Sequence, residues 1–276
     1  MTRTWIVTGS ARGLGRDLTE AALEAGHAVL ATARRPEQLD DLVARYGDRV
    51  RPFALDVTDP AGAEAAVAAA VEVFGGLDVV VNNAGWADLS ALEDTSIASF
   101  RAQLDTNLMG VVHLTKAAVP IFREQRSGHV IQISSVGGRV ASPGLSAYQA
   151  AKWAVGGFSE VVAAEVAPFG VRVTVVEPGG MRTEWASSSM TIPEVSAPYR
   201  ESVGARAERM GDDMSWASGD PRKVADVVVR IAAEENPPLR LLLGSDAFAI
   251  ARAAADLRAE EDLRLEPVTR STDATT

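Results

Sequence analysis

Short runs of β-branched and other apolar residues alternate with longer alanine-rich stretches along most of the chain. The run Val79-Val80-Val81 is continuously apolar, which is typical of a strand buried on both faces of a sheet. Such alternation favours a parallel sheet with right-handed crossovers and helices on both faces. The pattern therefore predicts a doubly wound α/β fold with a seven-stranded parallel sheet. The predicted strands are 4–8, 28–32, 50–55, 77–81, 128–134, 171–176 and 239–243, and the predicted helices are 13–25, 36–46, 60–74, 99–125, 146–168 and 221–234.

No low-complexity linker divides the 276 residues, so the chain is expected to form one domain over residues 1–262. The segment 180–219 has no clear strand pattern, and the alanine-rich segment 246–265 suggests a last helix. Residues 263–276 end in small polar residues and are expected to form a flexible tail.

Tyr148 and Lys152 are four residues apart in the predicted helix 146–168, and Ser135 lies thirteen positions before the tyrosine. Residues i and i+4 share one face of a helix, so the ammonium can lie beside the phenol. A free tyrosine has a pKa of about 10, and a nearby cation favours the phenolate. We therefore expect Lys152 to lower the pKa of Tyr148 and make it an acid–base group.

A glycine-rich turn follows the first predicted strand and reads Thr8-Gly-Ser-Ala-Arg-Gly-Leu-Gly15. A helix begins there, and its free N–H groups favour an anion. Gly9 permits a tight turn, and Gly13 and Gly15 leave room for a diphosphate. The position between a strand and a helix indicates a dinucleotide site.

Five separated elements together resemble the classical short-chain dehydrogenase/reductase family, over about 4–243. These are the glycine turn, the Asn82-Asn83-Ala84-Gly85 element, Asn107, the Ser135–Tyr148–Lys152 set, and Pro178-Gly179 with Thr183. The resemblance implies a single-domain Rossmann fold, with Asn107, Ser135, Tyr148 and Lys152 as the catalytic residues. It also implies that Lys152 holds the nicotinamide ribose and that Asn107 anchors a proton-relay water. The implied cofactor-binding residues are Gly9, Ser10, Arg12, Gly13, Leu14, Gly15, Arg34, Asp56, Val57, Asn83, Ala84, Gly85, Tyr148, Lys152, Pro178, Gly179 and Thr183.

Two of these assignments have alternatives. Asp56 resembles the family residue that bonds the adenine, but Asp56-Val-Thr-Asp-Pro also looks like a helix entrance that Asp56 would cap. Ser134 is adjacent to Ser135 and could take its role of donating a hydrogen bond to the substrate oxygen.

The end of the second predicted strand favours NADP(H) as the cofactor. Enzymes that use NAD place a carboxylate there for the ribose 2′-hydroxyl, and Ala33 has none. Arg34 follows it, and Arg12 precedes the second glycine of the turn. Arginine binds phosphate in bidentate fashion, which suits a 2′-phosphate. The alternative is that Arg34 and Arg35 merely lie in solvent.

The resemblance implies a substrate lid in 180–219, and Trp86, Val136, Met181 and Trp185 are expected to line the substrate pocket. These large apolar side chains suit a hydrophobic ketone, aldehyde or alcohol, although they could instead fill the core or an interface. The sequence does not separate substrates more finely.

Composition narrows the class of partner. A net charge of −10 disfavours nucleic acid as a partner. The sequence contains no run of 18 apolar residues, so no membrane span is expected. With no cysteine and no leader-like N-terminus, a cytoplasmic location is expected. The three histidines are scattered, so no metal site is expected. Residues 239–244 lack the family's usual Val-Asp-Gly-Gly-like ending, and helices 99–125 and 146–168 could pair subunits into a homodimer or homotetramer.

Three functions remain open. The first is an NADPH-dependent carbonyl reductase or secondary alcohol dehydrogenase. The second is an NAD-dependent alcohol dehydrogenase of the same fold. The third is a dinucleotide-sensing protein without catalysis, since one fold hosts many functions.

Overall fold

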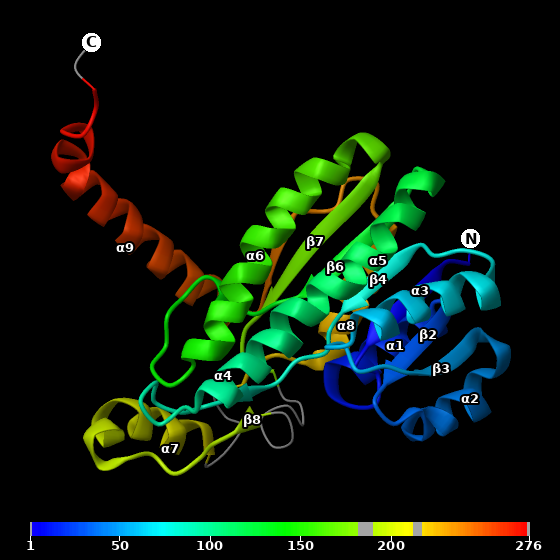
Figure 1. The fold of residues 1–276 in the computed structure, drawn as a ribbon, viewed down its shortest axis with the longest axis horizontal. Coiled ribbons are helices and arrows are strands. Elements are labelled where there is room, and N and C mark those ends of the chain that lie inside the picture. Colours follow the sequence, from blue (N-terminus) through cyan, green and yellow to red (C-terminus); the bar gives the residue numbers. More distant parts are fainter. Residues whose placement is uncertain (1, 182–189, 212–216, 275–276) are drawn as a thin grey trace.

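The computed structural model of the chain describes residues 2–181, 190–211 and 217–274. Its centre is a seven-stranded sheet in the order β3-β2-β1-β4-β6-β7-β9, with every neighbouring pair parallel (Figure 1). This sheet confirms the predicted doubly wound α/β fold. The strands are β1 (Thr4–Thr8), β2 (Ala28–Ala33), β3 (Val50–Ala54), β4 (Val79–Asn82), β6 (Gly128–Ile133), β7 (Val171–Pro178) and β9 (Arg240–Leu243).

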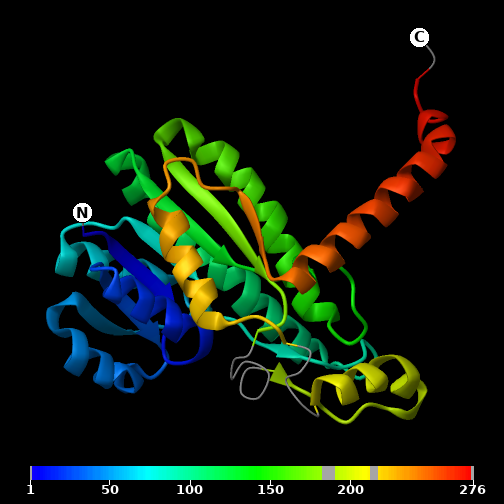
Figure 2. The same cartoon turned by 180° about the vertical axis from the view of Figure 1, so that it is seen from behind.

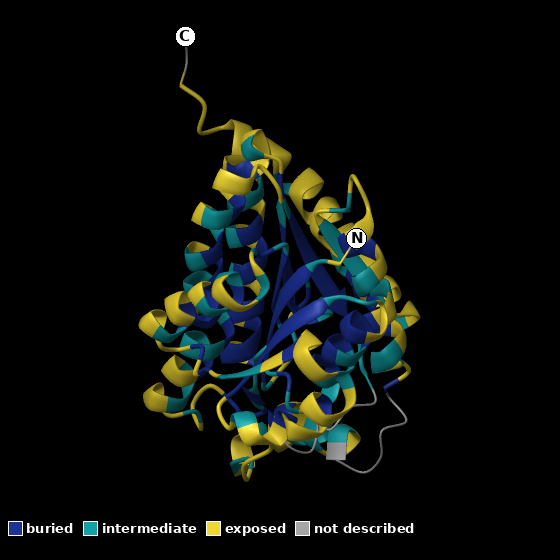
Figure 3. Ribbon diagram, turned by 90° about the vertical axis from the view of Figure 1, so that its right-hand side faces the viewer, coloured by how far each residue is buried: buried dark blue, intermediate teal, exposed yellow. Residues whose placement is uncertain are grey.

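Two hydrophobic cores sandwich the sheet, because successive side chains of a strand point to opposite faces. Trp5 and Val7 of β1 pack with α1 (Gly13–Glu24), α2 (Asp40–Tyr46) and α8 (Pro221–Ala233). Ile6 packs on the other face with α3 (Pro60–Phe74), α5 (Gly110–Gln125) and α6 (Ser146–Val166). Figure 3 shows the buried strands in the centre and the exposed outer sides of the helices.

Two of the predicted helices are divided. The predicted helix 36–46 consists of a 3₁₀ turn, Pro36–Leu39, followed by α2. The predicted helix 99–125 consists of α4 (Ile97–Leu104), a π-helical turn at Asp105–Met109, and α5. A π-turn inside a helix is rare and is frequent at functional sites, and this one carries Asn107.

A small second sheet lies beside the carboxyl ends of the main strands. In it β5 (Ala87–Asp88) pairs in parallel with β8 (Met190–Thr191), and α7 (Ala205–Gly211) follows. The sequence pattern did not predict these elements, since a two-residue strand is too short to show alternation. Met190 and Val203 belong to a third apolar cluster that also contains Tyr148, so part of the expected lid segment packs in the same cluster as the expected catalytic residue.

The last helix, α9 (Ser245–Arg270), runs away from the body of the protein (Figures 1 and 2). It extends five residues beyond the predicted helix 246–265, so the expectation of a flexible tail from residue 263 needs correction: the chain is helical as far as Arg270. Ion pairs within the helix, Glu261–Arg264 and Glu266–Arg270, have the i,i+3 and i,i+4 spacing that supports an exposed helix. None of the described helices is both long enough and apolar enough to cross a membrane.

Candidate active site

A cavity of about 1100 Å³ lies at the carboxyl ends of the strands. The strand order reverses between β1 and β4, which is the place where open α/β sheets bind ligands. The glycine turn leaves β1 at this point, and the Asn-Asn-Ala-Gly element leaves β4. The loops after β6 and β7 line the same cavity, so sequence elements far apart along the chain meet in one place.

The glycine turn has the conformation that its sequence predicts. Gly9 and Gly13 have positive φ values of 69° and 54°. A Cβ on Gly15 would lie only 2.2 Å from the carbonyl oxygen of Gly9, so no larger residue fits there. The cavity lining from this part of the fold comprises Gly9, Arg12, Gly13, Leu14, Gly15, Asn83, Ala84 and Gly85.

The threonine that precedes the glycines ties the two loops together. Its hydroxyl oxygen accepts the backbone N–H of Asn83 at 2.9 Å and that of Ala84 at 3.0 Å. The side-chain amide of Asn83 donates to the carbonyl oxygen of Thr8 at 2.8 Å. These hydrogen bonds hold the glycine turn and the Asn-Asn-Ala-Gly element together at the base of the cavity.

Four of the expected site residues, Ser10, Asn107, Thr183 and Trp185, are not among the residues that line the cavity. Ser10 is fully buried; its hydroxyl donates to the carbonyl oxygen of Val7 at 2.9 Å and its N–H to that of Thr32 at 2.9 Å. Both of its donors therefore serve the turn, and its role as a cofactor-binding residue stays a prediction. Thr183 and Trp185 lie outside the described residues.

The end of β2 contributes Ala33 and Arg34 to the cavity wall, together with Arg35 and Gln38. Asp56 and Val57, after β3, line the same region. Asp56 accepts from the N–H and hydroxyl of Thr58 at 3.0 and 2.7 Å, and these bonds hold the pKa of its carboxyl below the usual value. The alternative role of Asp56 as a helix cap is not found, because Asp59 caps α3 by accepting the N–H of Ala61.

Tyr148 lies near the start of α6, almost entirely buried, and its side chain is hydrogen-bonded to that of Ser135. Burial raises the pKa of the phenol to about 12, and the bond to Ser135 opposes this rise. The Ser135 oxygen also accepts the N–H of Gly137 at 3.0 Å, which orients the hydroxyl. The hydroxyl of Ser134 points elsewhere, toward the carbonyl oxygen of Lys152 at 3.4 Å. Of the two serines, Ser135 is the one bonded to the tyrosine.

Lys152 is buried one helical turn after Tyr148, and its ammonium donates to the carbonyl oxygen of Ile133 at 2.8 Å. The Nζ atom lies 5.6 Å from the centroid of the tyrosine ring. Burial lowers the pKa of Lys152 to about 8, because a charged amine is disfavoured away from water. The expected lowering of the Tyr148 pKa by Lys152 is not found, because burial raises the pKa of the phenol and only the bond to Ser135 opposes this rise.

Gly85 lies close to the side chains of two expected catalytic residues, Asn107 and Lys152. A Cβ there would lie 2.7 Å from Oδ1 of Asn107 and 3.7 Å from Nζ of Lys152. Asn107 itself is fully buried and is bonded to the backbone of Trp86. The indole N–H of Trp86 donates to the hydroxyl of Thr106 at 3.0 Å, so this ring is held in the cavity wall.

The lining of the cavity is partly apolar. Trp86, Val136 and Met181, which are expected to contact the substrate, are part of it, and the described residues of segment 180–219 add Thr191, Arg206 and Met210. Pro178 and Gly179 line it from the end of β7.

Asp246, at the start of α9, is a cavity residue that the sequence reasoning missed. Its Oδ2 accepts the N–H of Gly180 at 2.8 Å, and its buried Oδ1 has no hydrogen-bond partner among the described residues. A Cβ on Gly179 would lie 2.2 Å from this carboxylate, so the Pro-Gly element fits only as glycine. Nothing in the sequence indicated Asp246 at the cavity, because segment 246–265 resembles none of the family's sequence elements.

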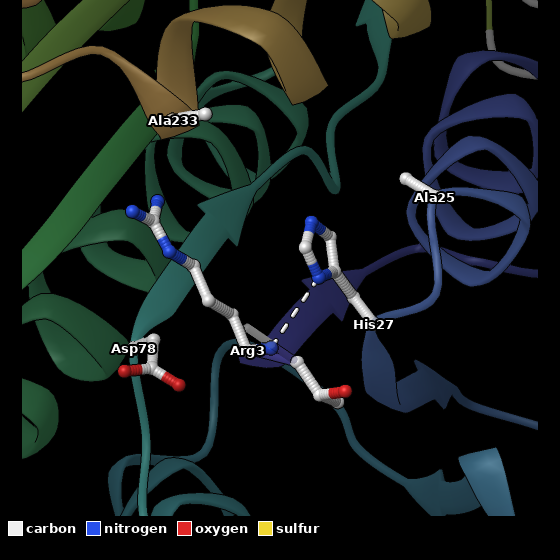
Figure 4. Close-up of a pocket in the computed structure, with 6 residues that line it drawn as sticks. Arg3, Ala25, His27, Asp78 and Ala233 are labelled. Carbon is white, nitrogen blue, oxygen red and sulfur yellow. Dashed lines mark hydrogen bonds between the residues drawn. The ribbon is translucent and has the colours of Figure 1, made fainter.

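A second hollow, of about 580 Å³, lies at the opposite edge of the sheet, before the starts of β1 and β4 (Figure 4). The backbone N–H of Arg3 donates there to Nδ1 of His27 at 3.3 Å. None of the expected site residues lines this hollow, so it is separate from the site. In the described ranges, no three His, Asp or Glu side chains gather as a metal site would require.

Comparison with known proteins identifies the family. A model of the short chain dehydrogenase family matches residues 3–191. The chain is 53% identical over 263 residues to Oxidoreductase BOA17 of Botryotinia fuckeliana (strain B05.10), covering 95% of this chain and 96% of that protein. A short-chain dehydrogenase structure from Streptomyces avermitilis matches with a TM-score of 0.92 and 40% identity over 99% of both chains. A short chain dehydrogenase from Burkholderia cenocepacia J2315, solved in complex with NADP, matches with a TM-score of 0.75 and 29% identity over 96% of this chain and 97% of that one. The chain thus belongs to the short-chain dehydrogenase family and is an oxidoreductase.

Proposed function

We propose that the protein is an NADP(H)-dependent oxidoreductase that interconverts a ketone or aldehyde and its alcohol. The carrying observation is that Tyr148, Ser135 and Lys152 line the same cavity as the glycine turn and Arg34. A proton donor, a hydroxyl hydrogen-bond donor and a dinucleotide cradle are the parts that such a reaction needs.

The residues present fit a dinucleotide with a 2′-phosphate. The glycines leave a cradle that a Cβ would fill, and the helix α1 begins at this cradle. Arg12 and Arg34 supply cations to the cavity wall, and Ala33 at the end of β2 carries no carboxylate. A relative of known structure was solved with NADP, which supports the choice of cofactor. When bound, the nicotinamide supplies the hydride chemistry.

The protein side chains would divide the remaining work. Tyr148 gives a proton to the carbonyl oxygen during reduction and takes it back from the alcohol during oxidation. The raised pKa keeps this phenol protonated at neutral pH, which suits the reductive direction. Ser135 donates a hydrogen bond to the same oxygen, and the ammonium of Lys152 lies near enough to stabilise negative charge on the phenol. The apolar wall formed by Trp86, Val136 and Met181 would hold the substrate's hydrophobic part.

A cofactor titration followed by a substrate panel tests this proposal. Binding of NADPH and NADH is measured first, by calorimetry. A panel of ketones and aldehydes is then followed at the nicotinamide absorbance, with Tyr148→Phe as the matched control. Reduction that depends on Tyr148 supports the proposal. Tight binding of NADPH with no turnover of any panel member would favour a dinucleotide-sensing protein, and a clear preference for NADH would favour the NAD-dependent dehydrogenase.

The subunit arrangement is a further part of the proposal. Trp153 and Val161 are exposed apolar residues on α6, and we propose that this helix pairs subunits into a homodimer or homotetramer. Sedimentation of the purified protein measures this directly.

A further inference from the structure

The short helix α7 places a cation over the substrate side of the cavity. Arg206 and Met210 are one turn apart on this helix, and both line the cavity. Val203, just before the helix, packs in the apolar cluster that contains Tyr148, and Met210 packs against that cluster. The face of α7 that carries Arg206 is therefore turned toward the reaction end of the cavity.

Arg206 differs from Arg139 and Arg240, two partly buried arginines that have a carboxylate counter-ion. Arg139 and Arg240 both bond to the buried carboxylate of Glu177, at 2.8 and 2.9 Å. In contrast, no ion pair to Arg206 exists within the described residues, and its buried Nε has no hydrogen-bond partner there. An unsatisfied buried donor is costly, and it is costlier when the group is charged.

Among the residues that the structure describes, no carboxylate forms an ion pair with this guanidinium. Burial lowers the pKa of Arg206, and the like charge of Arg209 lowers it further. Arginine nevertheless stays protonated in proteins, so the cavity keeps this positive charge. The positive charge of Arg206 is therefore available to a bound anion.

Three other charged groups of the cavity have hydrogen-bond partners within the chain. Asp56 accepts from Thr58 and Oδ2 of Asp246 accepts from Gly180, while Lys152 donates to Ile133. Arg12, Arg34 and Arg35 lie at the glycine turn and the end of β2, away from α7. Among the described residues, the cavity lining has five cationic side chains against two acidic ones, although the whole chain carries a net charge of −10. Such a cavity attracts anions. Its cationic members are Arg12, Arg34, Arg35, Lys152 and Arg206, and its acidic members are Asp56 and Asp246.

We propose that Arg206 binds a carboxylate of the substrate, so that the substrate class is a ketone or alcohol that carries a carboxylate away from the reacting carbon. The planar guanidinium matches a carboxylate in bidentate fashion. The carbonyl would lie at Tyr148 and Ser135, the apolar middle against Trp86 and Met210, and the charged end at α7. This inference rests on the proposed function and narrows the expected hydrophobic substrate to an amphipathic one.

Paired substrates that differ only in charge test the proposal. We would measure kcat/KM with NADPH for 4-oxo-4-phenylbutanoate and 5-oxo-5-phenylpentanoate, and for the methyl ester of each. The variants are Arg206→Met, which keeps the length of the side chain, Arg206→Lys, and the control Arg209→Met, an exposed arginine on the same helix.

The wild type is expected to prefer at least one acid over its ester. Arg206→Met should lose about 10–150-fold in kcat/KM for that acid, mainly through KM, and leave the ester unchanged. Arg206→Lys should restore part of the loss, and Arg209→Met should behave as the wild type. Equal losses for acid and ester, no preference for either acid, or an equal effect of Arg209→Met would overturn the proposal.

Two further measurements separate this inference from the proposed function. The affinity for NADPH should be unchanged in Arg206→Met, and a weakened affinity would show that Arg206 serves the cofactor instead. If the wild type reduces none of these ketones, the proposed reaction fails for this class, and calorimetry of each acid with the NADP⁺-loaded protein decides the anion site alone. Binding that Arg206→Met abolishes supports the site, and binding that Arg206→Met leaves intact overturns it.

Discussion

Asn107 bonds to the backbone of Trp86 with both ends of its side chain. Nδ2 donates to the carbonyl oxygen of Trp86 at 2.8 Å, and Oδ1 accepts its N–H at 3.0 Å. The asparagine is fully buried in the π-helical turn between α4 and α5. Only an amide offers a donor and an acceptor in this arrangement, so the pair ties the helix to the loop that leaves β4.

Asn107→Ala should destabilise the protein, because it removes the hydrogen-bond partner of both backbone groups of the half-buried Trp86. We expect the free energy of unfolding to fall by about 1–3 kcal/mol, measured by urea denaturation. Thr106→Ala is the matched control, since it removes only the partner of the Trp86 indole and should cost less. Equal stability of Asn107→Ala and the wild type would show that this pair of hydrogen bonds does not hold the loop in place.

Tyr148→Phe should keep the fold and NADPH binding but lose most of the turnover. The ring still fills the cluster with Leu145 and Val203, while the proton donor is gone. Loss of general acid catalysis is typically worth about 10²–10⁴ in rate. Single-turnover reduction of a fixed ketone measures it, and a rate within tenfold of the wild type would exclude Tyr148 as the acid.

Ser135→Ala should reduce kcat by about 10²–10³, as for the loss of one donor to a developing oxyanion. Ser134→Ala is the control, because that hydroxyl points to the backbone of Lys152 rather than to Tyr148. The two variants are compared by kcat at saturating ketone. A larger loss in Ser134→Ala would reverse the roles of the two serines.

The sheet could be predicted from sequence because its strands are buried on both faces and their pattern is strong. All five residues of β1 are buried, and the predicted and observed bounds of β1 and α3 are the same. The glycine turn was predictable for a different reason: Gly9 and Gly13 adopt positive φ, and Gly15 has no room for a side chain. Only glycine meets these steric requirements, so the residue type itself predicts the turn.

The parts that were missed depend on tertiary contacts that no spacing reveals. The sequence did not show that the hydroxyl of Ser10 bonds inside the turn. Asp246 and Arg206 reach the cavity only because the first turn of α9 and the helix α7 lie beside it. The pKa of Tyr148 was expected to fall through its neighbour Lys152, but burial, which depends on the whole fold, raises it.

The pH dependence of reduction should follow Lys152. The phenol stays protonated to about pH 12, whereas the pKa of Lys152 is lowered to about 8, so its charge is lost first as the pH rises. We expect kcat/KM for reduction to fall above about pH 8, since this parameter reports the free enzyme. In Lys152→Arg the residual rate should lack this fall, because arginine stays charged.

Stability provides a second readout of the same group. The folded pKa of Lys152 is below its unfolded value, so the unfolded chain binds more protons between about pH 8 and 10.5. The free energy of unfolding should therefore rise with pH across this window relative to Lys152→Met. A constant difference between the two proteins would contradict the lowered pKa.

The choice between NADPH and NADH should depend on the end of β2. Ala33→Asp places a carboxylate where the ribose 2′ position is expected, and Arg34→Ser withdraws a cation from the cavity wall. A carboxylate repels a 2′-phosphate and accepts from a 2′-hydroxyl, and each lost charge-assisted hydrogen bond costs about 1.5–3 kcal/mol. The double variant should therefore shift the ratio of kcat/KM values from NADPH toward NADH by at least about tenfold for one fixed ketone. Arg35→Ser is the matched control, since it removes a neighbouring arginine and leaves Ala33 and Arg34 in place. If the unmodified protein already prefers NADH, or if Arg35→Ser alone causes the shift, Arg34 does not bind the 2′-phosphate.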